Sequence, residues 1–355
     1  MIKKKTFTTT WNVDDTKLSH VDEKVVDKMI KWMKTLYGDD LRISRKKRHD
    51  YLGMSIDLLA ERQVTVTMVE YLKGVISNFE EVKILTVTAS SRAKRHLYTV
   101  REGCKHKKLD EKRGTAFHRA VAQLLFVCPR ARKDIQKATS FLTKKVRYPD
   151  EYDWVKLKHL LRYSRQTINM PLILRVDSLK IIKWWVDASY AVHLDMRGHT
   201  GATMSFVGVS VTGIAKNHKI NVKSSTEAEL IGARKSLPQM LWTQYSIEAQ
   251  CFTIDESIIL QNNLRAMLLE QNGMASSSKQ TNHIRVRYYL IKYCIAVGDI
   301  AVKHCPTKEI LSYHFTKPLQ GALFRKFRAE IQGIPTTMDE REMGCHAPGP
   351  FNVTP

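Results

Sequence analysis

Apolar runs between residues 171 and 333 constrain the fold of this chain more than any other feature. After a short strand expected at 172–175, they predict three strands, a helix, a strand, two helices, a strand and a final helix. The expected strands are 181–191, 202–211, 213–221, 257–261 and 300–304. The helix that begins at residues 225–226 contains Pro238, which should kink or split it. This order predicts an α/β domain with a mixed five-stranded sheet and flanking helices.

The remainder of the chain is expected to form separate units of the α+β kind. Residues 1–85 mix short apolar strands with turn signals, and residues 86–115 are polar and basic, as in a linker. Residues 116–170 predict two amphipathic helices, whose apolar stripes core packing explains. Residues 334–355 are rich in Pro and Gly and are expected to be a disordered tail.

A strong positive charge indicates a polyanionic partner. The chain has 58 Lys and Arg against 35 Asp and Glu, a net charge of +23. Half of the excess lies in residues 91–150, which hold 17 basic and 5 acidic residues. Nucleic acid is the expected partner, because neutralised phosphates release counterions. The predicted contacts are Arg92, Lys94, Arg95, Lys107 and Lys108.

Several classes of protein are excluded by composition. No apolar run approaches the roughly 18 residues of a membrane span, and the start of the chain lacks the apolar stretch of a signal peptide. The six cysteines contain no CxxC pair, so neither a zinc site nor a disulfide framework is indicated. We expect an intracellular protein, cytoplasmic or nuclear, and the sequence leaves its oligomeric state open.

Five segments resemble copia-type retrotransposon Pol polyproteins. Near the start, Trp11-Asn12-Val13-Asp14-Asp15 resembles the palm hairpin of the reverse transcriptase, and Tyr51-Leu52-Gly53-Met54 resembles its primer-grip hairpin. The more specific segments are Val186-Asp187-Ala188-Ser189, Ser224-Ser225-Thr226-Glu227-Ala228-Glu229-Leu230 and Phe315-Thr316-Lys317-Pro318-Leu319-Gln320-Gly321. The resemblance covers roughly residues 6–333, nearly the whole chain.

The resemblance implies a domain order and two activities. Residues 1–85 would be the end of a reverse-transcriptase palm and the start of its thumb, 86–115 a basic linker, and 116–170 a helical thumb or connection region. Residues 171–333 would be a ribonuclease H-like domain. The family synthesises DNA on RNA and cleaves RNA–DNA hybrids. Asp14 and Asp15 match two of three palm aspartates, and without the upstream third we expect no polymerase activity from this chain.

Hybrid cleavage uses two Mg²⁺ ions, which converging carboxylates hold. By resemblance, Asp187 is the first metal ligand and Glu229 the second. Glu229 competes for this role with Glu227, because Ser224-x-x-Glu227 and Thr226-x-x-Glu229 are both capping boxes.

The third and fourth ligand positions depart from the family pattern. Asn262 replaces one aspartate and Tyr313 the other, so the formal charge of the site falls from about −4 to about −2 against two divalent ions. We therefore expect a degenerate copy, inactive in both reactions, with impaired Mg²⁺ binding. Two alternatives stay open: a protein that only binds duplex or hybrid nucleic acid, and a weak metal-dependent ribonuclease in which Glu309 compensates, if its helix starts that early.

Overall fold

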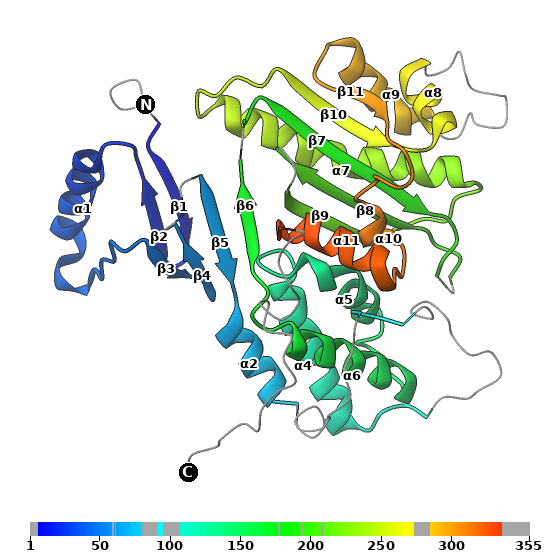
Figure 1. The fold of residues 1–355 in the computed structure, drawn as a ribbon, viewed down its shortest axis with the longest axis horizontal. Coiled ribbons are helices and arrows are strands. Elements are labelled where there is room, and N and C mark those ends of the chain that lie inside the picture. The colour runs from blue at the N-terminus through cyan, green and yellow to red at the C-terminus, as the bar shows by residue number, and fades with distance from the viewer. Residues whose placement is uncertain are drawn as a thin grey trace.

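The computed structural model describes residues 6–58, 60, 62–79, 91–94, 107–176, 178–193, 195–206, 209–272 and 285–335. These residues form a two-stranded, a four-stranded and a five-stranded sheet, with helices around them (Figure 1). The mixed α/β character predicted from the sequence is confirmed. None of the described helices is long and apolar enough to cross a membrane.

The two-stranded sheet is the hairpin predicted around the Asp-Asp pair. Strands β1 (Thr8–Asn12) and β2 (Asp15–Ser19) are antiparallel, and Asn12 lies opposite Asp15. Val13 and Asp14 therefore form the turn, where Val13 has a positive φ of 50°. The hairpin is followed by α1 (Glu23–Tyr37), in which no residue is buried. Several apolar side chains of this hairpin and helix are exposed, among them Trp11, Val13 and Trp32.

The second predicted hairpin begins the four-stranded sheet. Strand β3 (Arg48–Tyr51) pairs with β4 (Met54–Asp57) through a turn at Leu52 and Gly53, both of which have positive φ. A two-residue turn of this kind suits the right-handed twist of the strands. Strand β5 (Gln63–Thr67) pairs with β4, and the sheet order is β3-β4-β5-β6.

The fourth strand of this sheet is β6 (Leu172–Arg175), at the residues where a short strand was expected. Residues 172–175 do form a strand, but it pairs antiparallel with β5 and not with the strands that follow it. The cause is packing: Leu172 is buried in one apolar cluster with Val66, Leu72 and Leu157. The first sheet is thus closed by a segment more than 100 residues away along the chain, and the C-terminal sheet begins at residue 181.

The described part of the N-terminal half also contains the helices α2 (Val69–Ser77), α4 (Glu111–Val127), α5 (Gln136–Thr143) and α6 (Glu151–Gln166). Helix α4 begins inside the predicted linker 86–115, because the Asp110 side chain accepts a hydrogen bond from the Arg113 amide and so caps it. Residues 86–90 and 95–106 of that linker lie outside the described residues, as do residues 336–355 of the predicted tail.

The five-stranded mixed sheet of the C-terminal half is confirmed. Its strands are β7 (Ile181–Ser189), β8 (His199–Ser205), β9 (Ser210–Asn217), β10 (Glu256–Gln261) and β11 (Ala301–His304). The order is β11-β10-β7-β8-β9. Strands β7, β8 and β9 are antiparallel, whereas β10 runs parallel to β7 and to β11. Strands β8 and β9 each begin three residues earlier than predicted.

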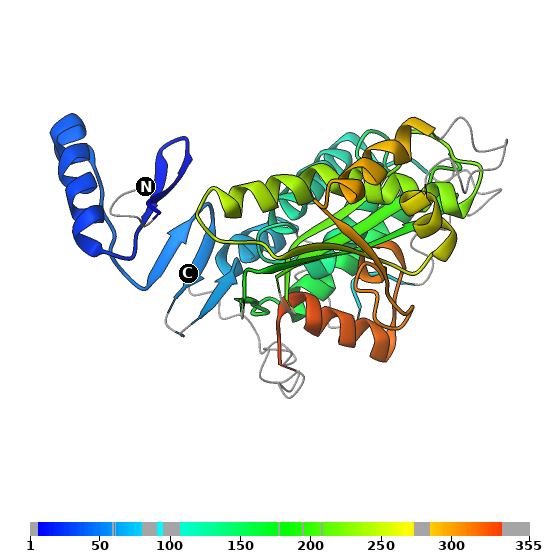
Figure 2. The same ribbon diagram turned by 90° about the horizontal axis from the view of Figure 1, so that it is seen from above.

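Helices cover both faces of this sheet (Figure 2). One face carries α7 (Ser225–Glu248), α8 (Leu264–Asn272) and α9 (Arg285–Ala296), and the other carries α10 (Tyr313–Thr316) and α11 (Gly321–Gln332). Because side chains alternate along β7, Trp184 packs in the cluster of α7, and Trp185 packs with Phe315 and Phe327. Helix α7 continues through Pro238, so the predicted split does not occur.

The helical region docks on the sheet edge formed by β9. The Gln136 Nε2 atom donates to the Gly213 carbonyl at 2.8 Å, and the Ser140 hydroxyl donates to the Ala215 carbonyl at 2.6 Å. The Lys133 ammonium donates to the carbonyl of Ser210. Edge carbonyls that would face water are thereby satisfied by side chains. The N-terminal and C-terminal halves share this interface.

A buried ion pair stabilises the same junction. The Arg132 guanidinium donates to both carboxylate oxygens of Asp134, each at 2.8 Å, and the Tyr163 hydroxyl donates to Asp134 at 2.8 Å. Burial opposes ionisation of Asp134, but Arg132 and the hydrogen bonds outweigh it and hold the pKa of this carboxyl below its usual value.

Candidate functional site

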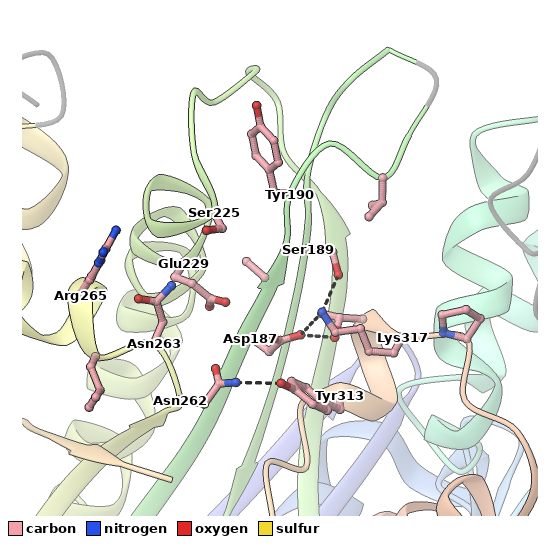
Figure 3. A pocket seen from close by; sticks show the side chains of 15 residues that line it. Asp187, Ser189, Tyr190, Ser225, Glu229, Asn262, Asn263, Arg265, Tyr313 and Lys317 are labelled. Carbon is pink, nitrogen blue, oxygen red and sulfur yellow. Dashed lines mark hydrogen bonds and ion pairs between the residues drawn. The ribbon is translucent and has the colours of Figure 1, made fainter. Parts of the chain in front are cut away.

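A pocket of about 690 Å³ lies where β7 and β10 end, beside the start of α7 and next to α10 (Figure 3). Its lining combines carboxylates, cations, amides and hydroxyl groups: Asp187, Ser189, Tyr190, Ser225, Glu229, Asn262, Asn263, Arg265, Tyr313, Thr316 and Lys317 are among the residues that form it. All four residues that the sequence assigned to one nuclease centre, or to its degenerate positions, therefore line one pocket.

Asp187 occupies the base of the pocket and is 2% exposed. The alternation along β7 places it on the face of α10, two residues after Trp185. The Thr316 hydroxyl donates a hydrogen bond to Asp187 Oδ2, and Lys317 Nζ lies 3.6 Å from the same oxygen. Both partners of this carboxylate come from α10 and the residue that follows it.

Glu229, and not Glu227, faces the pocket. The Ser224 hydroxyl accepts a hydrogen bond from the Glu227 amide at 3.2 Å, and the Glu227 carboxylate accepts one from the Lys223 amide at 2.8 Å. Glu227 thus serves the N-terminus of α7, as a capping residue does. Glu229 lies two residues further along α7 and lines the pocket together with Asp187.

The surroundings of Glu229 disfavour ionisation of its carboxyl group. Burial is the largest cause, and the nearby Asp187 carboxylate adds to it, so the pKa of Glu229 lies well above its usual value. Lys317 and a backbone hydrogen bond from Ala188 oppose this shift without cancelling it. Glu229 Oε2 is buried and has no hydrogen-bond partner among the described residues.

Asn262 and Tyr313, the two substituted positions, contact each other. Asn262 follows β10, and its Nδ2 atom donates to the Tyr313 hydroxyl at 2.7 Å (Figure 3). Burial and the Asp187 carboxylate both raise the pKa of Tyr313, so the phenol stays protonated. The two side chains, which the resemblance places where the family has aspartates, therefore bind each other in the pocket.

Glu309 does not join this group. It lies in the turn after β11, is exposed, and does not line the pocket. Helix α10 begins only at Tyr313, so the condition under which Glu309 would share its helical face is not met. The expectation that Glu309 could replace a missing ligand is wrong for this reason.

The residues present do not fit a two-metal cluster. Within the described residues, no group of three or more His, Cys, Asp or Glu side chains could hold a metal ion. The pocket offers two carboxylates, of which Asp187 is paired with Lys317 and Glu229 favours its protonated form. Mg²⁺ requires several oxygen ligands in near-octahedral geometry, and an ammonium group beside the carboxylate repels it.

Thr316 and Lys317 are the site residues to which the sequence assigned no role. Both lie in the segment Phe315 to Gly321 that carried part of the resemblance, so the signal was present. What the segment could not show is that the end of α10 directs both side chains onto Asp187.

The predicted nucleic-acid contacts that the structure describes differ in exposure. Arg92 is 1% exposed, and its guanidinium donates to the backbone carbonyls of Asp134 and His314. It stabilises the junction of the two halves, so its assignment as a nucleic-acid contact is corrected. Lys94 is exposed, and Arg95 lies outside the described residues.

Lys107 and Lys108 are exposed and belong to a basic surface with an aromatic side chain. Lys108 Nζ lies 5.7 Å from the ring centroid of Tyr148, and the Arg147 guanidinium lies 5.3 Å from it. Tyr148 is 65% exposed and borders a hollow of about 320 Å³. Basic side chains around an exposed ring are typical of surfaces that hold single strands.

The remaining candidates have no metal-binding arrangement. Asp14 and Asp15 are exposed on the β1–β2 hairpin, and neither lines the pocket.

The fold and the pocket define an α/β protein with a two-carboxylate site at the ends of its central strands. No protein-family model matches the chain, and no solved structure is significantly similar to it. Several curated proteins, however, are similar to the chain. The chain is 26% identical over 263 residues, 73% of its length, to the retrovirus-related Pol polyprotein from transposon TNT 1-94 of Nicotiana tabacum. It is 27% identical over 202 residues, 56% of its length, to that from transposon RE1 of Arabidopsis thaliana.

A third relative, the putative transposon Ty5-1 protein of Saccharomyces cerevisiae, is 27% identical over 64% of the chain and 72% of that protein. The chain spans only 19% of the tobacco polyprotein and 14% of the Arabidopsis RE1 polyprotein. These similarities confirm the predicted resemblance: the chain is similar to retrotransposon Pol polyproteins over 56% to 73% of its length.

Proposed function

We propose that residues 181–332 are a ribonuclease H-like domain of a copia-type element, preceded by a reverse-transcriptase remnant, and that this copy binds nucleic acid without cleaving it. The mixed sheet order β11-β10-β7-β8-β9, with α7 following the three antiparallel strands, supports the domain assignment. The relatives named above support the origin. The net charge of +23 supports the partner.

One observation carries the loss of cleavage: the hydrogen bond between Asn262 and Tyr313. These side chains occupy the positions of the third and fourth carboxylates, and they are paired with each other at 2.7 Å. An amide oxygen can bind a hard cation but brings no charge, and a protonated phenol binds Mg²⁺ poorly. Two divalent ions near 4 Å apart need more negative charge than Asp187 and Glu229 supply.

The reverse-transcriptase remnant supports no second activity. Asp14 and Asp15 lie in the exposed β1–β2 hairpin, and α1 beside it buries none of its residues. Among the described residues no third carboxylate joins the pair in a metal-binding group. Nucleotidyl transfer uses the same two-metal chemistry as hybrid cleavage and has the same need for converging carboxylates.

Calorimetric titration with Mn²⁺ tests the proposal. The wild type should show no saturable binding, whereas the double variant Asn262→Asp, Tyr313→Asp should bind Mn²⁺, and each single variant should bind less tightly, because ligands of one cluster act together. The matched control is Asn263→Asp with Tyr190→Asp, which adds the same charge to the pocket lining at other positions.

Asn263 is suited to this control because its side chain accepts a hydrogen bond from the Ala266 amide, a role that aspartate can also fill. Saturable Mn²⁺ binding by the wild type that disappears with Asp187→Asn would refute the proposal. Equal binding by the control and by the double variant would show that added charge suffices and that positions 262 and 313 are not special.

A further inference from the structure

Lys317 places a cation inside a pocket that, in the proposed family, would hold metal ions. Its ammonium lies 3.6 Å from Asp187 Oδ2, 3.3 Å from the Ser189 hydroxyl and 5.1 Å from the centre of the Tyr313 ring (Figure 3). The Asp187 partner is almost fully buried, whereas the Lys317 side chain is 39% exposed. The Lys317 side chain therefore covers the Asp187 carboxylate and is itself accessible from the pocket.

The backbone around Lys317 is held firmly. Its amide donates to the Tyr313 carbonyl at 2.9 Å at the end of α10, and its carbonyl accepts from the Arg92 guanidinium at 3.4 Å. The preceding residue, Thr316, is bonded to Asp187. A side chain anchored in this way loses little conformational freedom when it binds a ligand, which favours binding.

The charge of the pocket also differs from that of a metal site. Its lining contains two carboxylates, Asp187 and Glu229, and two cations, Arg265 and Lys317, so the formal charge is zero. Arg265 and Lys317 supply the positive charge that an anion requires, whereas a divalent cation at Asp187 would meet the Lys317 ammonium 3.6 Å away.

We propose that this pocket binds a backbone phosphate of nucleic acid without a divalent metal ion, through Lys317 and the exposed Arg265. This inference rests on the proposed function, since it names the group that the non-cleaving domain contacts. An ammonium has three donors. Two of them are directed at Asp187 and Ser189, and the third remains for a phosphate oxygen in the pocket.

The first experiment measures hybrid binding in EDTA by fluorescence anisotropy over a range of salt concentrations. Lys317→Met should weaken binding about five- to tenfold and reduce the slope of log K against log salt by about 0.9, the value for one phosphate contact. The matched control is Lys326→Met, which removes another exposed lysine that pairs with a carboxylate, Glu330 at 3.9 Å on α11. Lys317→Arg should retain most of the affinity.

The second experiment measures whether Asp187→Asn strengthens or weakens hybrid binding. If Lys317 binds phosphate, removal of its counter-charge should strengthen binding in EDTA about threefold or more. If the carboxylate acts through a metal ion, the same change should weaken binding in Mg²⁺ and have no effect in EDTA. The matched control is Asp255→Asn, which also releases a lysine, Lys180 at 3.4 Å, but outside the pocket.

Two results would overturn the inference. One is equal binding by Lys317→Met and Lys326→Met; the other is no gain from Asp187→Asn beyond that of Asp255→Asn. The proposed function fails by a different result, namely metal binding or cleavage by the wild type. Circular dichroism of each variant distinguishes lost contacts from lost folding.

Discussion

Glu270 offers the most quantitative test of the electrostatics in this domain. It lies on α8, is fully buried, and accepts a hydrogen bond from Gln261 Nε2 at 3.2 Å. Its second carboxylate oxygen has no partner among the described residues. Burial raises the pKa of Glu270 to about 8, from the ordinary value of 4.5. A glutamine at this position has the same shape and cannot ionise.

The magnitude follows from proton linkage. Because the folded pKa is raised, the stability that the protonated carboxyl contributes is present below pH 4.5 and is lost as the pH rises through about 8. At pH 7 the pH is about 2.5 units above the pKa of this carboxyl in the unfolded chain. Each unit adds about 1.36 kcal/mol to the cost of keeping the carboxyl protonated in the folded state. Glu270→Gln should therefore raise the free energy of unfolding by about 3 kcal/mol at pH 7 and by less than about 1 kcal/mol at pH 5.

Urea denaturation at both pH values measures this difference. Glu309→Gln is the matched control, because Glu309 is exposed and its replacement should leave stability unchanged at either pH. Equal stability of Glu270→Gln and wild type at pH 7 would refute the reasoning. An equal gain in the free energy of unfolding at pH 5 would also refute it, because ionisation of Glu270 could not cause a gain of that size at pH 5.

Three further outcomes are expected. Asp134→Asn should lower the free energy of unfolding by about 3–5 kcal/mol, measured by urea denaturation, because it leaves the buried Arg132 guanidinium without its counter-charge. Reversal of Lys107 and Lys108 to Glu should weaken hybrid binding and lower the salt slope by at least about 1.8 in the anisotropy assay. Tyr313→Phe, assayed like Asp134→Asn, should cost about 1 kcal/mol, since it removes a hydrogen-bond acceptor from the pocket.

Much of the C-terminal sheet could be predicted because its signals are local. The apolar run that ends in Asp187 predicts β7. Ser224, three residues before Glu227, caps the helix that follows the first three strands. The turn at Leu52 and Gly53 likewise depends on residues that lie next to each other in the sequence. In each case the physical cause acts within one element.

Contacts between distant segments could not be predicted from the sequence. The pairing of β6 with β5 joins Leu172 to Val66, and no periodicity within either strand reveals that partner. Arg92 is typical of a basic surface in its local sequence, yet it is buried because the carbonyls of Asp134 and His314 accept its donors. The pattern of charges along a chain does not show which charges the tertiary structure covers.

The candidate site was predictable in part. The resemblance named Asp187 and Glu229, and both line the pocket. The choice between Glu229 and Glu227 needed the structure, in which the Glu227 carboxylate accepts a hydrogen bond from the Lys223 amide. The role of Lys317 could not be foreseen, since it depends on where α10 ends relative to β7. The same start of α10 excludes Glu309, because the residues before Tyr313 form a turn.

The most direct test of the central claim is cleavage of a labelled RNA–DNA hybrid by the purified wild-type protein in Mg²⁺ and in Mn²⁺. With Asn262 and Tyr313 paired and Lys317 on Asp187, the account predicts no product above the level that Asp187→Asn gives. Metal-dependent cleavage by the wild type that Asp187→Asn abolishes would contradict it.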